Sequence, residues 1–184
     1  AEADEIDPTV ADGRLRRVLP LPPRYGLSTG HGVRENLGFE GLATTRDGRY
    51  LFAGIENALA QDGPVADAGV PSPSRILRFD LERKGPPSEF AYWVDAVSTV
   101  PTNGERFCVN GLSDLLPLGE DRLLVLERQF VEGVGNAARI YDVSLDGSRF
   151  IVAQEGAETA GAARPPLTLV ENWTALLTRR SSAA

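Results

Sequence analysis

The sequence predicts an all-β fold, and within that class part of a β-propeller built from four-stranded antiparallel blades. Its apolar runs are short, rich in β-branched and aromatic residues, and bounded by Gly, Pro and Asp clusters. Asp47-Gly48 and Asp146-Gly147 accept the positive φ that tight hairpin turns require. A weak internal repeat of about 64 to 74 residues relates two pairs of hairpins, which is the expected strand content of two blades.

These signals predict eight strands in chain order. The segments are 39–45, 50–56, 75–81, 89–94, 111–118, 122–127, 139–143 and, with the weakest pattern, 150–153. Residues 57–74 and 129–138 are predicted as long loops inside the repeat, and 64–74, 85–87 and 157–166 are rich in strand-breaking Pro, Gly, Ala and Ser. One short helix is predicted at 171–178, capped by Asn172. The ends, 1–12 and 179–184, are predicted to be disordered.

The repeat also sets the domain prediction. Gly41-Leu42, a turn at Asp47 and the strand that follows recur as Gly111-Leu112, a turn at Asp121 and residues 123–127. Two such units do not close a ring of the usual ~4–8 blades. We therefore expect one domain over 1–184 that is a fragment of a longer propeller. A β-sandwich, whose hairpins also resemble one another, is the alternative.

Composition excludes several classes of partner. The chain has 184 residues, 42% of them hydrophobic, which is enough for one domain with a sizeable core. Its net charge of -7 argues against nucleic acid or an anionic membrane surface as a main partner, because those partners attract Lys and Arg. No apolar run reaches the ~20 residues of a membrane span. Cys108 is the single cysteine, so no intrachain disulfide can form.

Several carboxylate, amide and guanidinium side chains lie in or beside the apolar hairpins and are the candidate site residues. They are Arg34, Asn36, Glu40, Glu56, Asn57, Asp62, Asp114, Glu127 and Arg128. Carboxylate and amide oxygens suit calcium, which takes ~6–8 oxygen ligands, although no linear calcium motif is present. The alternative is structural: Glu40, Glu56 and Glu127 would pair with arginines such as Arg34, Arg75 and Arg128 to hold the strands together.

The sequence lacks residues that other known catalytic motifs require. His31 lies in a Gly-His-Gly-Val-Arg run that only superficially matches the core of histidine acid phosphatases, because the preceding arginine and a second histidine are missing. No G-x-S-x-G elbow supports a serine hydrolase. One histidine and one cysteine far apart do not make a zinc site. The sequence therefore shows no recognisable nucleophile.

Five segments in order, 33–63, 74–81, 89–95, 111–128 and 138–143, resemble the esterase-like phytase family. The resemblance spans roughly residues 13–143. Its most specific motifs are N-x-G-F-E-G-L-A at 36–43, R-I-x-x-F-D at 75–80 and L-V-L-E-R at 124–128. The resemblance implies a β-propeller that is usually exported, so a secreted or periplasmic location is expected for a protein whose signal peptide is not in this chain.

The resemblance further implies hydrolysis of phosphate-ester or carboxyl-ester bonds in a small-molecule substrate. Calcium would be held by some of Glu40, Glu56, Asp62 and Glu127, with Glu40 and Glu127 also catalytic and with Arg34, Asn36 and Arg128 binding the substrate. Family members are about twice as long, so the missing propeller half is an expected partner. The alternative is a non-catalytic propeller that binds a ligand or another protein.

Overall fold

The computed structural model describes residues 2–6, 15–99, 101, 107–146 and 149–155, and every structural statement below concerns them. These residues form ten strands and one 3-10 turn, η1 (Pro23–Tyr25), which confirms the all-β prediction. Among them no helix is long and apolar enough to cross a membrane.

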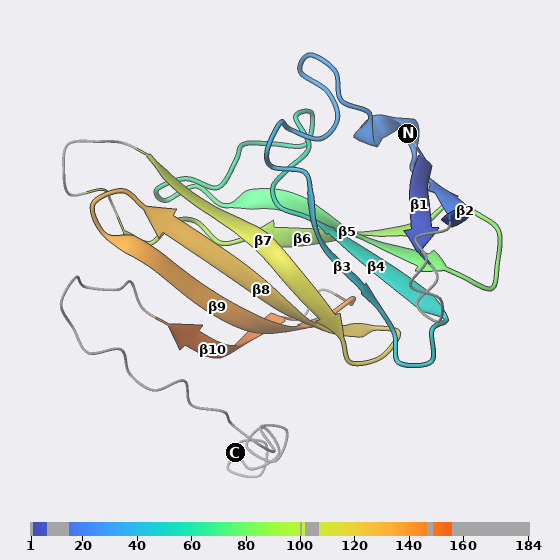
Figure 1. Cartoon of the computed structure of the whole chain (residues 1–184). Helices are drawn as coiled ribbons and strands as arrows, with labels where there is room; N and C mark the ends of the chain where they lie inside the picture. Colours follow the sequence, from blue (N-terminus) through green and yellow to red (C-terminus); the bar gives the residue numbers. More distant parts are fainter. Residues whose placement is uncertain (1, 7–14, 100, 102–106, 147–148, 156–184) are drawn as a thin grey trace, which may run out of the picture.

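Two four-stranded antiparallel sheets form the body of the molecule (Figure 1). The first contains β3 (Phe39–Thr44), β4 (Tyr50–Ile55), β5 (Ser72–Asp80) and β6 (Ser88–Val94). The second contains β7 (Cys108–Pro117), β8 (Arg122–Val131), β9 (Gly135–Ser144) and β10 (Arg149–Glu155). A small two-stranded sheet, β1 (Glu2–Ile6) with β2 (Leu15–Pro20), accompanies them. Each strand of the two large sheets pairs with its neighbour in sequence, so both sheets are simple meanders and all eight predicted strands are present.

The predicted loop over 129–138 is wrong. β8 and β9 continue through most of it and are joined by a tight turn in which the Val134 N–H donates to the Val131 carbonyl at 3.0 Å. Gly133 and Gly135 supply the positive φ angles, 75° and 112°. Gln129 and Ala137 are buried in these strands, and such polar and small residues hid the strand pattern.

The predictions for the ends are only partly covered by the structure. Glu2–Ile6 forms strand β1, paired with β2, although the sequence predicted a disordered end over 1–12. The strand forms by backbone pairing with β2, and the acidic side chains of this short segment give no strand pattern from which it could be predicted. The rest of that end, the loop at 157–166, the helix at 171–178 and the end at 179–184 lie outside the described residues.

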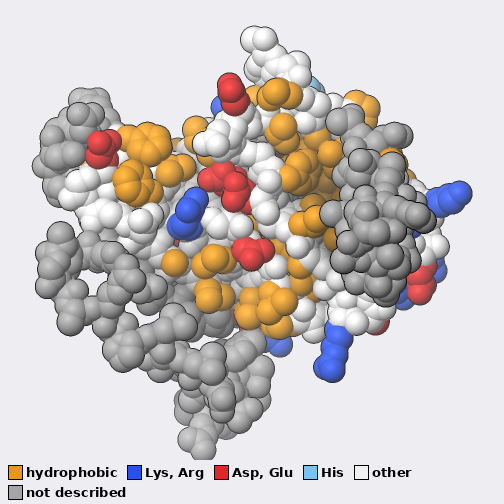
Figure 2. Space-filling view, viewed as in Figure 1, with side chains coloured by type: hydrophobic (Ala, Val, Ile, Leu, Met, Phe, Trp, Pro, Cys, Tyr) orange, Lys and Arg blue, Asp and Glu red, His pale blue; other side chains and the backbone are white. Residues whose placement is uncertain are grey.

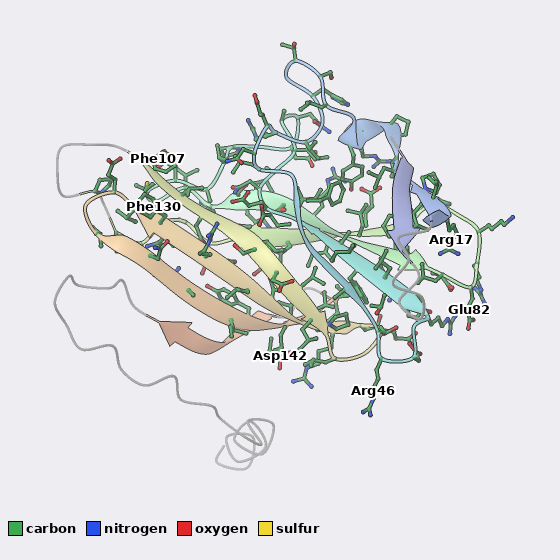
Figure 3. The ribbon with its side chains drawn as sticks, viewed as in Figure 1. Arg17, Arg46, Glu82, Phe107, Phe130 and Asp142 are labelled. Carbon is green, nitrogen blue, oxygen red and sulfur yellow. The ribbon has the colours of Figure 1, made fainter. Side chains whose placement is uncertain are left out.

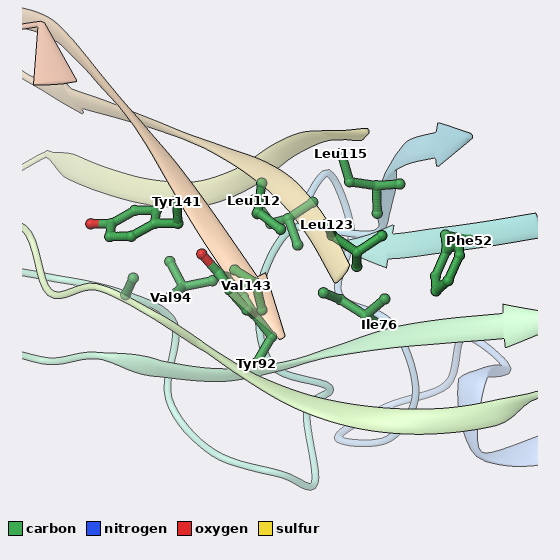
Figure 4. Packing of buried hydrophobic residues seen from close by; sticks show 11 residues of the cluster. Phe52, Ile76, Tyr92, Val94, Leu112, Leu115, Leu123, Tyr141 and Val143 are labelled. Atoms are coloured by element: carbon green, nitrogen blue, oxygen red, sulfur yellow. The ribbon is translucent and has the colours of Figure 1, made fainter. Parts of the chain in front are cut away.

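The main hydrophobic core lies between the two large sheets (Figure 4). Phe52, Ile76 and Val94 enter it from the first sheet, and Leu112 and Leu123 enter it from the second; all five are at most 1% exposed. Burying one large apolar side chain completely stabilises a fold by about 1.5–3 kcal/mol. These side chains therefore hold the two sheets together.

A second core covers the other face of the first sheet. Ile55 and Leu77 pack there against Tyr25, which the N-terminal segment brings over the sheet. Both faces of β5 are therefore buried. The outer face of the second sheet is more open within the described part of the chain, where Leu116 of β7 is 57% exposed and Phe130 of β8 is 37% exposed.

The two sheets meet most closely where β7 runs beside β3 and the end of β4 (Figure 1). A Cβ added at Gly54 would lie only 2.5 Å from Leu112 Cδ2, and one at Gly41 would lie 3.1 Å from the Leu115 backbone nitrogen. Glycine at these positions is what allows the strands to approach.

We expect Gly54→Ala to destabilise the protein by roughly 1–3 kcal/mol, because the added methyl group must displace the fully buried Leu112. Urea unfolding measures the change. Gly119→Ala is the matched control, since nothing lies within 4 Å of its added Cβ. Equal stabilities of the two variants would show that the seam between the sheets is not tightly packed.

Candidate functional site

Glu56 follows β4 directly and is fixed by its backbone between the two sheets. Its N–H donates to the Gly38 carbonyl at 2.7 Å, and its own carbonyl accepts the Leu112 N–H at 3.1 Å. The side chain then lies against Gly111 of β7, where an added Cβ would come within 2.4 Å of Glu56 Cγ. As a result only 9% of Glu56 is exposed.

Two of the other predicted site residues lie close enough to act on the Glu56 charge. Glu40 belongs to β3, and Arg128 of β8 is the cross-strand partner of Gly111; both are exposed. Figure 2 shows acidic side chains with a basic one beside them over the line where β3 and β7 run together. We call Glu40, Glu56 and Arg128 the seam cluster. The structure thus brings together three of the seven residues to which the resemblance assigns a role.

Burial, and secondly the Glu40 carboxylate, raise the pKa of Glu56 from the ordinary value of about 4.5 to about 7, against the opposing effect of the Arg128 guanidinium. The described residues form neither a hydrogen bond nor an ion pair with the Glu56 carboxylate. A carboxyl group with a pKa near neutrality can both accept and donate a proton at physiological pH. A guanidinium beside it can bind an anionic oxygen.

Glu127 lies in a different environment although it is the neighbour of Arg128. Successive residues of a strand point to opposite faces, so Glu127 faces the core between the sheets and is 1% exposed. Its carboxylate accepts hydrogen bonds from Tyr92 Oη at 2.8 Å, Asn110 Nδ2 at 2.6 Å and the Asp95 N–H at 3.1 Å. The structure therefore shows Glu127 linking the two sheets, and its predicted catalytic role stays a prediction.

Asp62 and Arg34 are also engaged elsewhere. Arg75 binds both oxygens of Asp62, Nε to Oδ2 at 2.6 Å and Nη2 to Oδ1 at 2.9 Å, and also binds Glu89 at 2.8 Å. Arg34 donates to the carbonyls of Ala58 at 3.1 Å and Gly63 at 2.7 Å, and so holds the loop after β4. Neither Asp62 nor Arg34 is among the charges that shift the Glu56 pKa.

Asn36, the remaining predicted substrate ligand, is exposed in a turn with φ 58°. The Leu37 N–H donates to the Arg34 carbonyl across this turn at 3.2 Å. Asparagine tolerates this left-handed conformation better than most residues, so the turn alone accounts for its presence.

The pairings proposed as a structural alternative are not the ones formed. Within the described part of the chain, Arg75 pairs with Asp62 and Glu89, and Arg34 binds backbone carbonyls. Neither arginine binds Glu40, Glu56 or Glu127. Arg128 acts on Glu56 through its charge, without an ion pair within 4 Å.

Within the described residues, the structure does not bring the four predicted calcium ligands together at one place. Among the described residues no group of three or more His, Cys, Asp or Glu side chains is placed to hold a metal. Arg75 occupies both oxygens of Asp62, and three donors occupy the carboxylate of Glu127. Glu40 and Glu56 alone supply fewer than the ~6–8 oxygens that calcium takes.

Sequence reasoning missed Gly111, whose lack of a side chain makes room for Glu56. The signal was present, because Gly41-Leu42 recurs as Gly111-Leu112 in the internal repeat. It marked a repeat, however, and did not show that the second glycine would lie against a carboxylate from another strand.

We predict that Glu56 makes the stability of the protein depend on pH. Its pKa is higher folded than unfolded, so the folded state binds more protons between about pH 4.5 and 7, and stability is lost as pH rises through this range. Between pH 4.5 and 7 this effect lowers the free energy of unfolding by up to about 3 kcal/mol. Glu56→Gln should abolish this pH-dependent decrease. Urea unfolding across this range measures it, with the exposed Glu35→Gln as control. Parallel pH profiles for wild type and Glu56→Gln would contradict the prediction.

For Glu127→Gln we expect a destabilisation on the order of 2–4 kcal/mol, because the new amide group would place donors against hydrogen-bond donors in a buried site. The measurement is chemical unfolding at pH 7. Tyr92→Phe, which removes only one of the three hydrogen bonds, should cost less. A stable Glu127→Gln variant would mean that this carboxylate is not needed to join the sheets.

No match was found among curated proteins or among solved structures. Residues 4–175 match the family described as "Phytase-like: Esterase-like activity of phytase". This match covers most of the chain and includes all three residues of the seam cluster. The chain therefore belongs to the phytase-like family, which is described by an esterase-like activity of phytase.

Proposed function

We propose that this protein hydrolyses ester bonds at the seam cluster of Glu40, Glu56 and Arg128. The observation that carries the proposal is the Glu56 carboxyl group, which is held between the sheets by its backbone and has a pKa of about 7. Acid–base catalysts work best with a pKa near the operating pH. Membership of a family described by esterase-like activity supports the same reaction type.

In the proposed mechanism the ionised Glu56 takes a proton from a water molecule as that water attacks the carbonyl carbon of the ester. Arg128 donates hydrogen bonds to the oxygen that becomes negative. The carbon–oxygen bond to the alcohol then breaks, and the proton held by Glu56 passes to the leaving alkoxide. The products are a carboxylic acid and an alcohol. Glu40 acts by keeping the pKa of Glu56 high.

The charge of the cluster favours carboxyl esters over phosphate esters. With Glu56 ionised, two carboxylates face a single guanidinium, and this local excess of negative charge repels a dianionic phosphate. A neutral carboxyl ester meets no such repulsion before it reacts. Phytate, which carries many phosphates, is the least favourable substrate on this argument.

A second candidate function, ligand or partner binding without catalysis, is favoured by one observation. Apolar side chains are exposed on β3, which carries Glu40, and on β7, which lies against Glu56: Leu42 of β3 is 66% exposed and Leu116 of β7 is 57% exposed. An open surface with apolar groups around a few charges also suits recognition of another molecule.

We also propose that the two large sheets are adjacent blades of a propeller. Each is a four-stranded meander, their first strands β3 and β7 lie side by side, and the sequence repeat relates them. Secretion or export and the contribution of further blades stay predictions. No step of the mechanism uses calcium, and the calcium prediction is tested in the assay below.

The test is hydrolysis of p-nitrophenyl acetate and p-nitrophenyl phosphate by the purified chain, with added calcium and with chelator. We expect acetate ester turnover that rises with pH through about 7, since the base must be ionised. Glu56→Gln should reduce kcat by about 10²-fold or more, and Arg128→Met should also reduce it. Glu35→Gln and Arg46→Met are exposed controls.

Turnover that survives Glu56→Gln would rule out this site. If no ester is hydrolysed while the chain remains folded by circular dichroism, the non-catalytic function is favoured instead. Activity that requires calcium would support the calcium prediction and would mean that the mechanism proposed here is incomplete.

A further inference from the structure

A second polar site lies in a pocket that contains none of the predicted site residues. The pocket has a volume of about 740 Å³ and opens between the segment after β6 and strand β9. Its walls include the short apolar side chains of Ala68, Ala96 and Val97 and the polar side chains of Asp95, Ser98 and Arg139. This volume is within the range of about 300–1,000 Å³ typical of small-molecule sites.

Arg139 is the informative residue of this pocket. It is only 8% exposed, and its guanidinium donates one hydrogen bond, from Nη2 to Ser98 Oγ at 2.9 Å. The described residues place no carboxylate within 4 Å of it. A guanidinium has five N–H donors, and a buried charge is normally paired. Arg139 therefore has donors available at a wall of the pocket.

The acidic residue paired with Arg139 across the strands forms no ion pair with it within 4 Å among the described residues. Glu127 is its cross-strand partner on β8. However, the Glu127 carboxylate accepts hydrogen bonds from Tyr92 and the Asp95 N–H of the first sheet and its following segment, and from Asn110 of the neighbouring strand β7. Ser98 therefore accepts one hydrogen bond from the Arg139 guanidinium, and the other N–H groups can bind a ligand in the pocket.

We propose that this pocket binds a small organic monocarboxylate through Arg139. A guanidinium matches a carboxylate with two parallel hydrogen bonds. Asp95 also lines the pocket, with its carboxylate accepting the Tyr141 hydroxyl, and its negative charge disfavours a dianion such as phosphate. The apolar walls accept the hydrocarbon part of the ligand. The site is independent of the seam cluster, because Arg139 and Arg128 lie on opposite faces of the second sheet.

The experiment uses 4-fluorobenzoate as the probe, observed by ¹⁹F NMR during titration with the whole chain. We expect saturable line broadening for 4-fluorobenzoate, at least tenfold weaker binding of the neutral 4-fluorobenzyl alcohol, and weaker binding of the dianionic 4-fluorophenyl phosphate. Arg139→Met should abolish the broadening by 4-fluorobenzoate. Ser98→Ala, which removes the hydrogen bond that orients Arg139, should weaken it.

Arg46→Met is the matched control for charge, because Arg46 is an exposed residue of the β3–β4 turn (Figure 3) and does not line the pocket. It should bind 4-fluorobenzoate like wild type. Should Arg139→Met lose the wild-type circular dichroism spectrum, Arg139→Lys decides: tenfold weaker binding supports the proposal, and unchanged affinity overturns it. Absence of binding, equal binding of the alcohol, or tighter binding of the phosphate would also overturn it.

Discussion

The close approach of β7 to the end of β4 is the constraint on which the rest of this structure depends. Glu56 gives its carbonyl to the Leu112 N–H, and Gly54 and Gly111 leave the space that side chains would otherwise fill. Asn57, fully buried beside them, donates to the Asn110 carbonyl at 3.0 Å. These contacts fix the angle at which the two sheets share one core, and they bring a carboxylate from one sheet to the edge of the other.

Two glutamates at this junction show how environment separates structural from chemical roles. Glu127 is buried but receives three donors, so its charge is satisfied inside the protein. Glu56 is also buried but receives none from the described residues, and Glu40 adds a like charge beside it. Its proton is therefore held more tightly. Both follow apolar runs in the sequence, and only their partners distinguish them.

Local patterns predicted the eight strands, the hairpin turns and the paired-hairpin repeat, because alternation and turn residues are local properties. They failed at Gln129, whose polar side chain is buried in β8. They could not assign partners to charges either, since Asp62 meets Arg75 and Glu40 meets Glu56 only through the packing of strands. All members of the seam cluster were among the predicted site residues. The sequence did not show that Glu127, predicted with them, would lie on the opposite face of β8.

The pleat of β8 explains why two adjacent charged residues lie in different environments. Arg128 points to the open face with Glu56, while Glu127 points into the core opposite Arg139. A change of register by one residue would exchange these environments, placing a guanidinium among the donors that now bind Glu127. The register is held by the apolar residues Leu123 and Val125, which are completely buried on the same face as Glu127. The hydrophobic pattern of this strand therefore determines which face of the sheet carries Arg128 and which carries Glu127.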